Sequence, residues 1–112
     1  NPLERREDQK KIWRRKVNNE LKSRYKKIFS LIDTIVFLKI PSFKYVYKWR
    51  LLQERKLQLT SKSKKTMSSS QVKRFIMFYE RVSKQMIKDA PKRAQVVLSL
   101  SRKHKFFKIK FN

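Results

Sequence analysis

The sequence contains no glycine and no cysteine, and each absence excludes a class of site. Average usage near ~7% glycine would give about eight in a chain of 112 residues. A loop that cradles phosphates through its backbone N–H groups needs glycine where it turns sharply or approaches the ligand closely. The lack of cysteine excludes disulfides and thiolate metal sites. Any nucleotide site linked to this chain must therefore have its main backbone anchor elsewhere.

Acidic residues, histidine and long apolar runs are also scarce. Eight Asp and Glu face 32 Lys and Arg, which gives a formal net charge of +24. Of these cations 21 are lysine, a solvated point charge that suits general basicity more than shaped recognition. The longest apolar run, Ile35–Leu38, is far too short to cross a bilayer, and no secretory signal is present. We expect an intracellular, cytoplasmic protein without membrane contact, with the single His104 in a turn.

Hydrophobic periodicity predicts the order helix, strand, helix, helix, strand, strand. The strand that ends at Pro41 is expected to be buried on both faces, and the last strand to be half-buried. The third helix should begin at the capping-box pair Ser68 and Gln71 and end at Pro91. The expected helices cover 8–32, 43–57 and 68–91, and the expected strands 34–40, 95–100 and 105–111, with a turn over 101–104.

Strands separated by helices favour an α/β fold with some parallel pairing. Three short strands make a poor sheet, so the chain is expected to be the second half of a larger α/β domain. The segment 60–68 is predicted to be a mobile, lid-like loop. Its lysines, Lys62, Lys64 and Lys65, either close over a polyphosphate or are simply solvated.

Three groups of charged residues each have a functional and a structural interpretation. The block Lys44–Arg50 mixes bases with aromatics, as in a stacking and phosphate-binding surface, or as in a basic amphipathic helix. Arg50 and Arg55 could reach phosphates, with Glu54 orienting Arg50, or Arg50 and Glu54 could form a surface i,i+4 pair. The acids Glu4, Glu7 and Asp8 could lie near a substrate, or favour a helix N-terminus.

Three stretches, in their order and spacing, carry a resemblance to a known family. They are Asn1–Glu4 with Trp13–Leu21, Ile35–Phe43 with Val46–Glu54, and Met67–Ser68 with Val72, Phe75, Tyr79 and Ala94–Leu98. Together they resemble the C-terminal part of the D-glycerate 3-kinase family, whose members are P-loop kinases akin to phosphoribulokinase and uridine kinase. The most specific block is Tyr-Lys-Trp-Arg-Leu-x-x-Glu over 47–54. Thr66 stands where the family usually has glycine before Met-Ser.

The resemblance implies transfer of the γ-phosphate of ATP to the 3-hydroxyl of D-glycerate with Mg²⁺. It implies a three-layer α/β fold with a parallel sheet that ends in a short strand pair, all 112 residues belonging to one domain. The P-loop would lie in an N-terminal half outside these residues, so this chain alone is expected to hold no cofactor and to be inactive. The implied ATP-phosphate cations are Arg50, Arg55 and Lys48, with Glu54 orienting Arg50, and Asn1 and Glu4 would lie near the substrate.

Two other functions remain open from the sequence. The net charge and the interleaved aromatics also fit a basic RNA-binding or ribosome-associated protein. A decayed kinase that keeps its fold as an interaction module is the third hypothesis.

Overall fold

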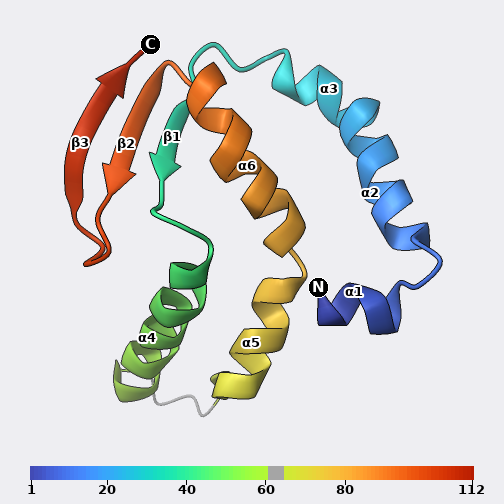
Figure 1. The fold of residues 1–112 in the computed structure, drawn as a ribbon, viewed down its shortest axis with the longest axis vertical. Coiled ribbons are helices and arrows are strands. Elements are labelled where there is room, and N and C mark those ends of the chain that lie inside the picture. Colours follow the sequence, from blue (N-terminus) through green and yellow to red (C-terminus); the bar gives the residue numbers. More distant parts are fainter. Residues whose placement is uncertain (61–64) are drawn as a thin grey trace. The chain divides into compact units, whose positions relative to one another are not determined.

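The computed structural model describes residues 1–60 and 65–112, which fall into two compact units, Asn1–Ile35 and Val36–Asn112. Figure 1 shows the elements of both along the chain. The predicted lid-like loop lies partly outside the described residues, including Lys62 and Lys64. That all 112 residues belong to one kinase domain stays a prediction.

The first unit consists of three short helices, α1 (Pro2–Glu7), α2 (Ile12–Lys22) and α3 (Arg24–Phe29). The prediction of one continuous helix over 8–32 is therefore wrong. Lys11 is left-handed, with φ 59°, and Ser23 leaves the helical conformation between α2 and α3. The Ser23 hydroxyl donates to the Asn19 carbonyl at 2.6 Å. Such back-bonding bends helices, which fits the break here.

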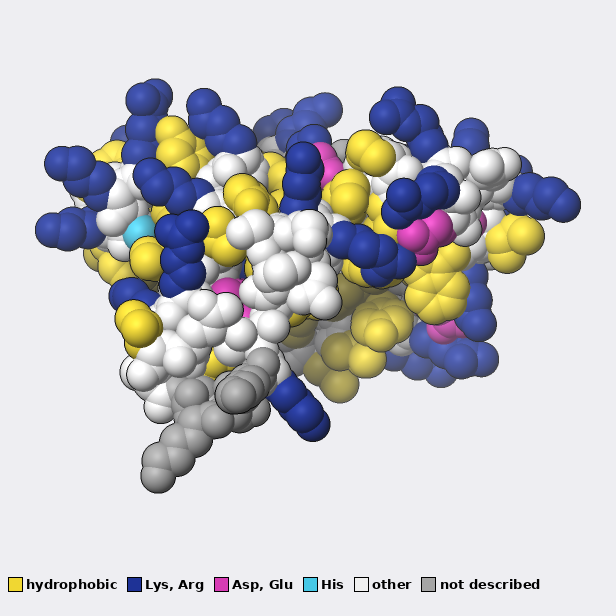
Figure 2. All heavy atoms as spheres, turned by 90° about the horizontal axis from the view of Figure 1, so that it is seen from below, with side chains coloured by type: hydrophobic (Ala, Val, Ile, Leu, Met, Phe, Trp, Pro, Cys, Tyr) yellow, Lys and Arg dark blue, Asp and Glu magenta, His cyan; other side chains and the backbone are white. Residues whose placement is uncertain are grey.

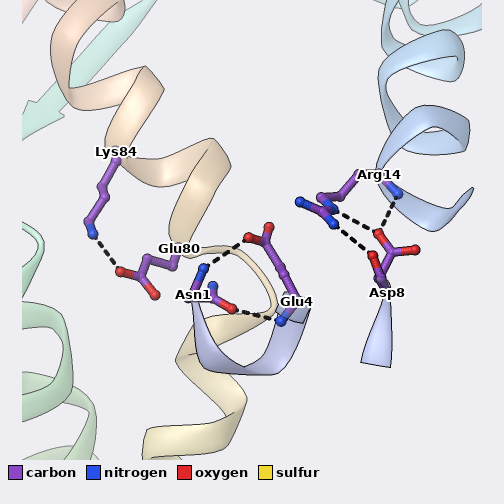
Figure 3. Close-up of polar contacts among 6 residues, drawn as sticks. All are labelled: Asn1, Glu4, Asp8, Arg14, Glu80 and Lys84. Carbon is purple, nitrogen blue, oxygen red and sulfur yellow. Dashed lines mark hydrogen bonds and ion pairs between the residues drawn. The ribbon is translucent and has the colours of Figure 1, made fainter. Parts of the chain in front are cut away.

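Local polar contacts define the helix starts in this unit (Figure 3). Asn1 Oδ1 accepts from the Glu4 N–H at 3.0 Å, and a Glu4 carboxylate oxygen accepts from the Asn1 nitrogen at 3.1 Å. This capping box precedes Pro2 at the first turn, a favoured position for proline. Asp8 similarly accepts from the N–H groups of Trp13 and Arg14 at the start of α2. Helix α1 was missed although Asn-Pro-x-Glu is a recognisable start signal.

The second unit contains a three-stranded mixed sheet in the order β1 (Val36–Lys39), β2 (Val96–Leu100), β3 (Phe106–Phe111). β1 runs parallel to β2, and β2 antiparallel to β3. The prediction of an α/β fold with some parallel pairing and a terminal strand pair is confirmed. The predicted turn is confirmed too, because the Ser101 carbonyl accepts from the His104 N–H at 3.0 Å and His104 has φ 60°.

Three helices accompany the sheet: α4 (Lys44–Thr60), α5 (Ser69–Met77) and α6 (Glu80–Arg93). The predicted start of the third helix is confirmed by the capping box of Ser68 and Gln71. One helix up to Pro91 was expected, but the chain leaves the helix between α5 and α6. The Phe78 N–H bonds the Phe75 carbonyl three residues back, which tightens and ends α5. Pro91 lies inside the last turns of α6 and does not end it.

The buried apolar side chains of this unit come from α5, β2 and the segments beside them. The prediction that β1 is buried on both faces is wrong, since Val36 and Leu38 are about half exposed. β3 is exposed along its whole length, so the half-buried prediction is also wrong. Cross-strand register puts Val36 and Leu38 on the same face as Ile109 and Phe111, and no described element buries that face. The buried apolar residues are Phe43, Val72, Ile76, Ala94, Val97 and Leu100.

Candidate functional site

A pocket of about 510 Å³ opens beside α4 in the second unit. Trp49, Arg50 and Lys56 line it from α4, Ile40 from the end of β1, and His104 from the β2–β3 turn. Tyr79, between α5 and α6, also lines it. The pocket therefore lies near the carboxyl ends of the two parallel strands, where open α/β sheets bind ligands. This makes it the candidate site.

Arg50 is held in a fixed direction by two neighbours one helical turn or less away. Its Nη2 lies 2.6 Å from Glu54 Oε1, and its Nη1 donates to Gln53 Oε1 at 2.8 Å. The guanidinium carbon lies 5.6 Å from the centre of the Phe75 ring. A guanidinium has five N–H donors in a rigid fork, so these two contacts leave three for an incoming anion. The Arg50 side chain is 24% exposed, enough for an anion to reach it.

Glu54 is the only buried charged residue among those the structure describes, at 3% exposure. Its second oxygen, Oε2, accepts from the Met67 N–H at 3.0 Å. The sequence left open whether Arg50 and Glu54 form an ordinary surface pair, and the burial of Glu54 excludes that interpretation. The carboxylate joins α4 to the segment before α5 and fixes the Arg50 fork at the same time.

A second contact closes the pocket from the hairpin side. The rings of Trp49 and His104 stack with their centres 4.2 Å apart and their planes 13° apart. This contact joins α4 to the β2–β3 turn across more than fifty residues of chain. The sequence predicted a turn at His104 but gave no sign of its partner, because nothing local couples the two rings.

Tyr79 supplies a neutral hydroxyl near this arginine. Burial raises the pKa of Tyr79 above its ordinary value, although the Arg50 charge acts in the opposite direction. The phenol therefore keeps its proton at neutral pH and can donate a hydrogen bond. The rings of Phe43 and Phe75 contact the Tyr79 ring edge-on, with their centres 6.3 and 5.6 Å from its centre.

The other predicted site residues lie outside this pocket. Lys48 and Arg55 are exposed on α4 and are not among its lining residues. Asn1 and Glu4 belong to the first unit, where they form the capping box of α1. Their mutual hydrogen bonds match the helix-start interpretation of the acidic cluster, as does Asp8 at the start of α2. Lys65 is described and exposed.

Positive charge dominates the surface, as the face in Figure 2 shows with many Lys and Arg and few acidic side chains. Within residues 1–60 and 65–112, no three His, Cys, Asp or Glu side chains gather as a metal site. The pocket thus offers cations that fit the phosphates of ATP, and no carboxylate cluster that fits Mg²⁺.

In the same described part of the chain, no helix has the length and apolar character needed to span a membrane.

Comparison with family models, with curated proteins and with solved structures gives no match.

Proposed function

We propose that this chain is the C-terminal part of an ATP-dependent small-molecule kinase of the D-glycerate 3-kinase type. In this proposal Arg50 binds a phosphate of the bound nucleotide, and Lys56 adds a second cation. Phosphoryl transfer depends mainly on positioning the phosphates and neutralising their charge, so an oriented arginine is a useful contribution. The P-loop, the ligands of Mg²⁺ and the site for D-glycerate would be supplied outside these 112 residues.

The observation that carries the proposal is the fixed direction of the Arg50 fork. An arginine that serves only as a surface charge has no need of a buried carboxylate behind it. Here Glu54 Oε1 lies 2.6 Å from Nη2, and Arg50 lines an open pocket. A preorganised fork loses less entropy when it binds a phosphate, because its geometry is already set.

The uncovered sheet face also supports a larger domain. Val36, Leu38, Ile109 and Phe111 present apolar side chains on one face, each more than half exposed. Contiguous exposed apolar surface of this kind marks a place where other protein packs. In a three-layer α/β kinase, helices cover both faces of the sheet. The proposed N-terminal half would supply that cover.

Nucleotide titration of the 112-residue chain tests the role of Arg50. A Trp13→Phe background leaves Trp49, in the pocket wall, as the single tryptophan, whose fluorescence can be excited selectively over that of tyrosine. We expect weak binding that strengthens from adenosine to AMP, ADP and ATP. Arg50→Lys, which keeps the charge and loses the fork, should weaken ATP binding by about tenfold, since bidentate charge-assisted contacts contribute on the order of 1.5–3 kcal/mol.

Arg93→Lys is the matched control, because Arg93 is exposed on α6, lies outside the pocket and is not among the predicted phosphate cations. It should leave the ATP affinity unchanged. Equal effects of the two variants, or ATP binding no tighter than adenosine binding, would contradict the proposal.

The kinase assignment itself has a separate test. The coding sequence before Asn1 should contain a strand, a G-x-x-x-x-G-K-[ST] loop and a helix, and the longer protein should phosphorylate D-glycerate. The 112-residue chain alone should give no phosphorylated glycerate from Mg·ATP. Turnover by that chain would overturn the placement of the P-loop outside it.

A further inference from the structure

A second and larger pocket, of about 670 Å³, lies over one face of the sheet, opposite to the uncovered apolar face. Four cations line it: Lys39 from β1, Arg102 from the hairpin turn, and Lys108 and Lys110 from β3. No Asp or Glu is among its lining residues. The kinase proposal makes no use of this pocket.

The strand register gathers these cations on one face. Lys39 pairs across β1 and β2 with Ser99, and Ser99 pairs across β2 and β3 with Lys108. Lys110 pairs with Val97 in the neighbouring row. Directly paired residues share a face, and so do residues two apart along a strand. Lys39, Lys108 and Lys110 therefore project on the same side of the sheet.

A β-bulge adds an aromatic ring to this cationic surface. The register passes from Ser99 opposite Lys108 to Leu100 opposite Phe106, so Phe107 is the extra, unpaired residue. Neighbours in a regular strand point to opposite faces, yet Phe107 and Lys108 both line the pocket. Bulges re-aim side chains in this way, and they are frequent next to functional sites. The Phe107 side chain is 67% exposed.

The charge of this region is not balanced within its own segment. Residues 90–112 contain seven Lys and Arg and no Asp or Glu. A concave surface lined by one sign of charge focuses its field and concentrates counter-ions. An anionic ligand would relieve the mutual repulsion of these cations.

The spacing of the cations indicates what kind of anion fits. Lys108 and Lys110 are about 6.8 Å apart along the strand, and Lys39 is about 10 Å from Lys108 across two strand spacings. One phosphate group cannot contact all of them, whereas a chain of phosphates can. We propose that the pocket lined by Lys39, Lys108, Lys110 and Arg102 binds single-stranded nucleic acid, with a base stacked on Phe107.

Stacking on an exposed aromatic ring requires an unpaired base, which favours a single strand over a duplex. Lysine point charges contact a backbone without reading the sequence, so we expect little sequence preference. The combination of a basic groove with an aromatic platform is the general design of sequence-tolerant single-strand binding.

The test is titration of the 112-residue chain with a fluorescent eight-nucleotide oligouridylate or oligothymidylate at several salt concentrations. Lys108→Gln with Lys110→Gln should weaken binding, and should reduce the slope of log affinity against log salt by about 1.4, at about 0.7 for each lost phosphate contact. Lys73→Gln with Lys88→Gln is the matched control, because both lysines are exposed on helices and outside this pocket.

A second pair of variants tests the stacking. Phe107→Leu should weaken binding about fivefold or more, as expected for one stacked base. Phe111→Leu, on the same strand but on the opposite face, should leave binding unchanged. Equal effects within either matched pair would overturn the proposal. So would equally tight binding of a duplex, of polyphosphate or of free mononucleotide. Arg50 is not among the residues that line this pocket, so the outcome of this test is independent of the kinase test.

Discussion

Each of the two units contains an Arg–Glu ion pair with i,i+4 spacing, and the two pairs differ in the distance between their charged atoms and in their exposure to solvent. In the first unit, Arg24 Nε lies 3.5 Å from Glu20 Oε2, and the Arg24 side chain is 85% exposed. In the second unit, Arg50 lies 2.6 Å from a Glu54 side chain that is 4% exposed. Identical spacing in sequence thus gives one solvated pair and one that is largely removed from water.

The difference extends to the units themselves. Among the described residues, Leu3 is the one buried hydrophobic side chain of the first unit, where Trp13 and Leu31 are mostly exposed. Its helices are fixed by contacts between residues close in sequence, such as Asp8 with Arg14. The second unit has paired strands and buried side chains from distant segments. Long-range burial therefore decides how much a given polar contact contributes to stability.

The largest expected effect comes from breaking the buried pair. Arg50→Leu leaves the Glu54 carboxylate without its cation, and removing one partner of a buried pair costs about 3–5 kcal/mol. The partial exposure of Arg50 reduces this, so we expect the free energy of unfolding to fall by about 2–3 kcal/mol. Arg24→Leu should change it by less than about 0.5 kcal/mol. Urea denaturation of both variants measures the contrast.

A double variant separates the lost pair from other effects of the leucine. Replacing Glu54 as well, as Arg50→Leu with Glu54→Leu, removes the buried charge and should recover much of the stability lost in the single variant. Equal destabilisation by Arg50→Leu and Arg24→Leu would mean that burial does not separate the two pairs.

The next effect concerns the buried apolar side chains. Val72 on α5 is fully buried, at 0% exposure, whereas Val17 on α2 is partly exposed. Val72→Ala creates a cavity and should lower the free energy of unfolding by about 2 kcal/mol. Val17→Ala should cost about 0.5 kcal/mol or less, and alanine also favours the helix. Thermal or urea unfolding followed by circular dichroism measures both, and similar losses would contradict the contrast.

Local signals in the sequence predicted the local features of the fold. The Ser68–Gln71 capping box, the 101–104 turn and the alternation in the last strand depend on neighbouring residues, and all three elements are present. The i,i+4 spacing likewise allowed the prediction that Glu54 orients Arg50. These features could be read from the sequence because the interactions that form them span a few residues.

Burial and long-range contacts could not be predicted in this way. Phe107, Ile109 and Phe111 are apolar at alternate positions, yet each remains more than half exposed. The stack of Trp49 on His104 and the bulge at Phe107 depend on how distant segments align. Periodicity tells which residues share a face, and the rest of the fold decides whether that face is covered.

The smallest expected effect is a pH dependence confined to the first unit. Partial desolvation raises the pKa of Asp8, but hydrogen bonds from Arg14 and from the Trp13 and Arg14 N–H groups outweigh it and hold the pKa below the ordinary value of 3.8. A carboxyl with a lowered folded pKa stabilises the fold above its unfolded pKa, and this contribution disappears as the pH falls through the folded value. We therefore expect the start of α2 to fray below about pH 4, with faster hydrogen exchange at the Trp13 and Arg14 amides.

Asp8→Asn should show that faster exchange already at neutral pH, and the loss of protection should no longer change when the pH is lowered. The amides of Val97 and Leu98, in the central strand β2 with a paired strand on each side, serve as the internal control and should keep their protection in the variant. Loss of protection in the sheet together with α2 would show that the two units do not respond separately.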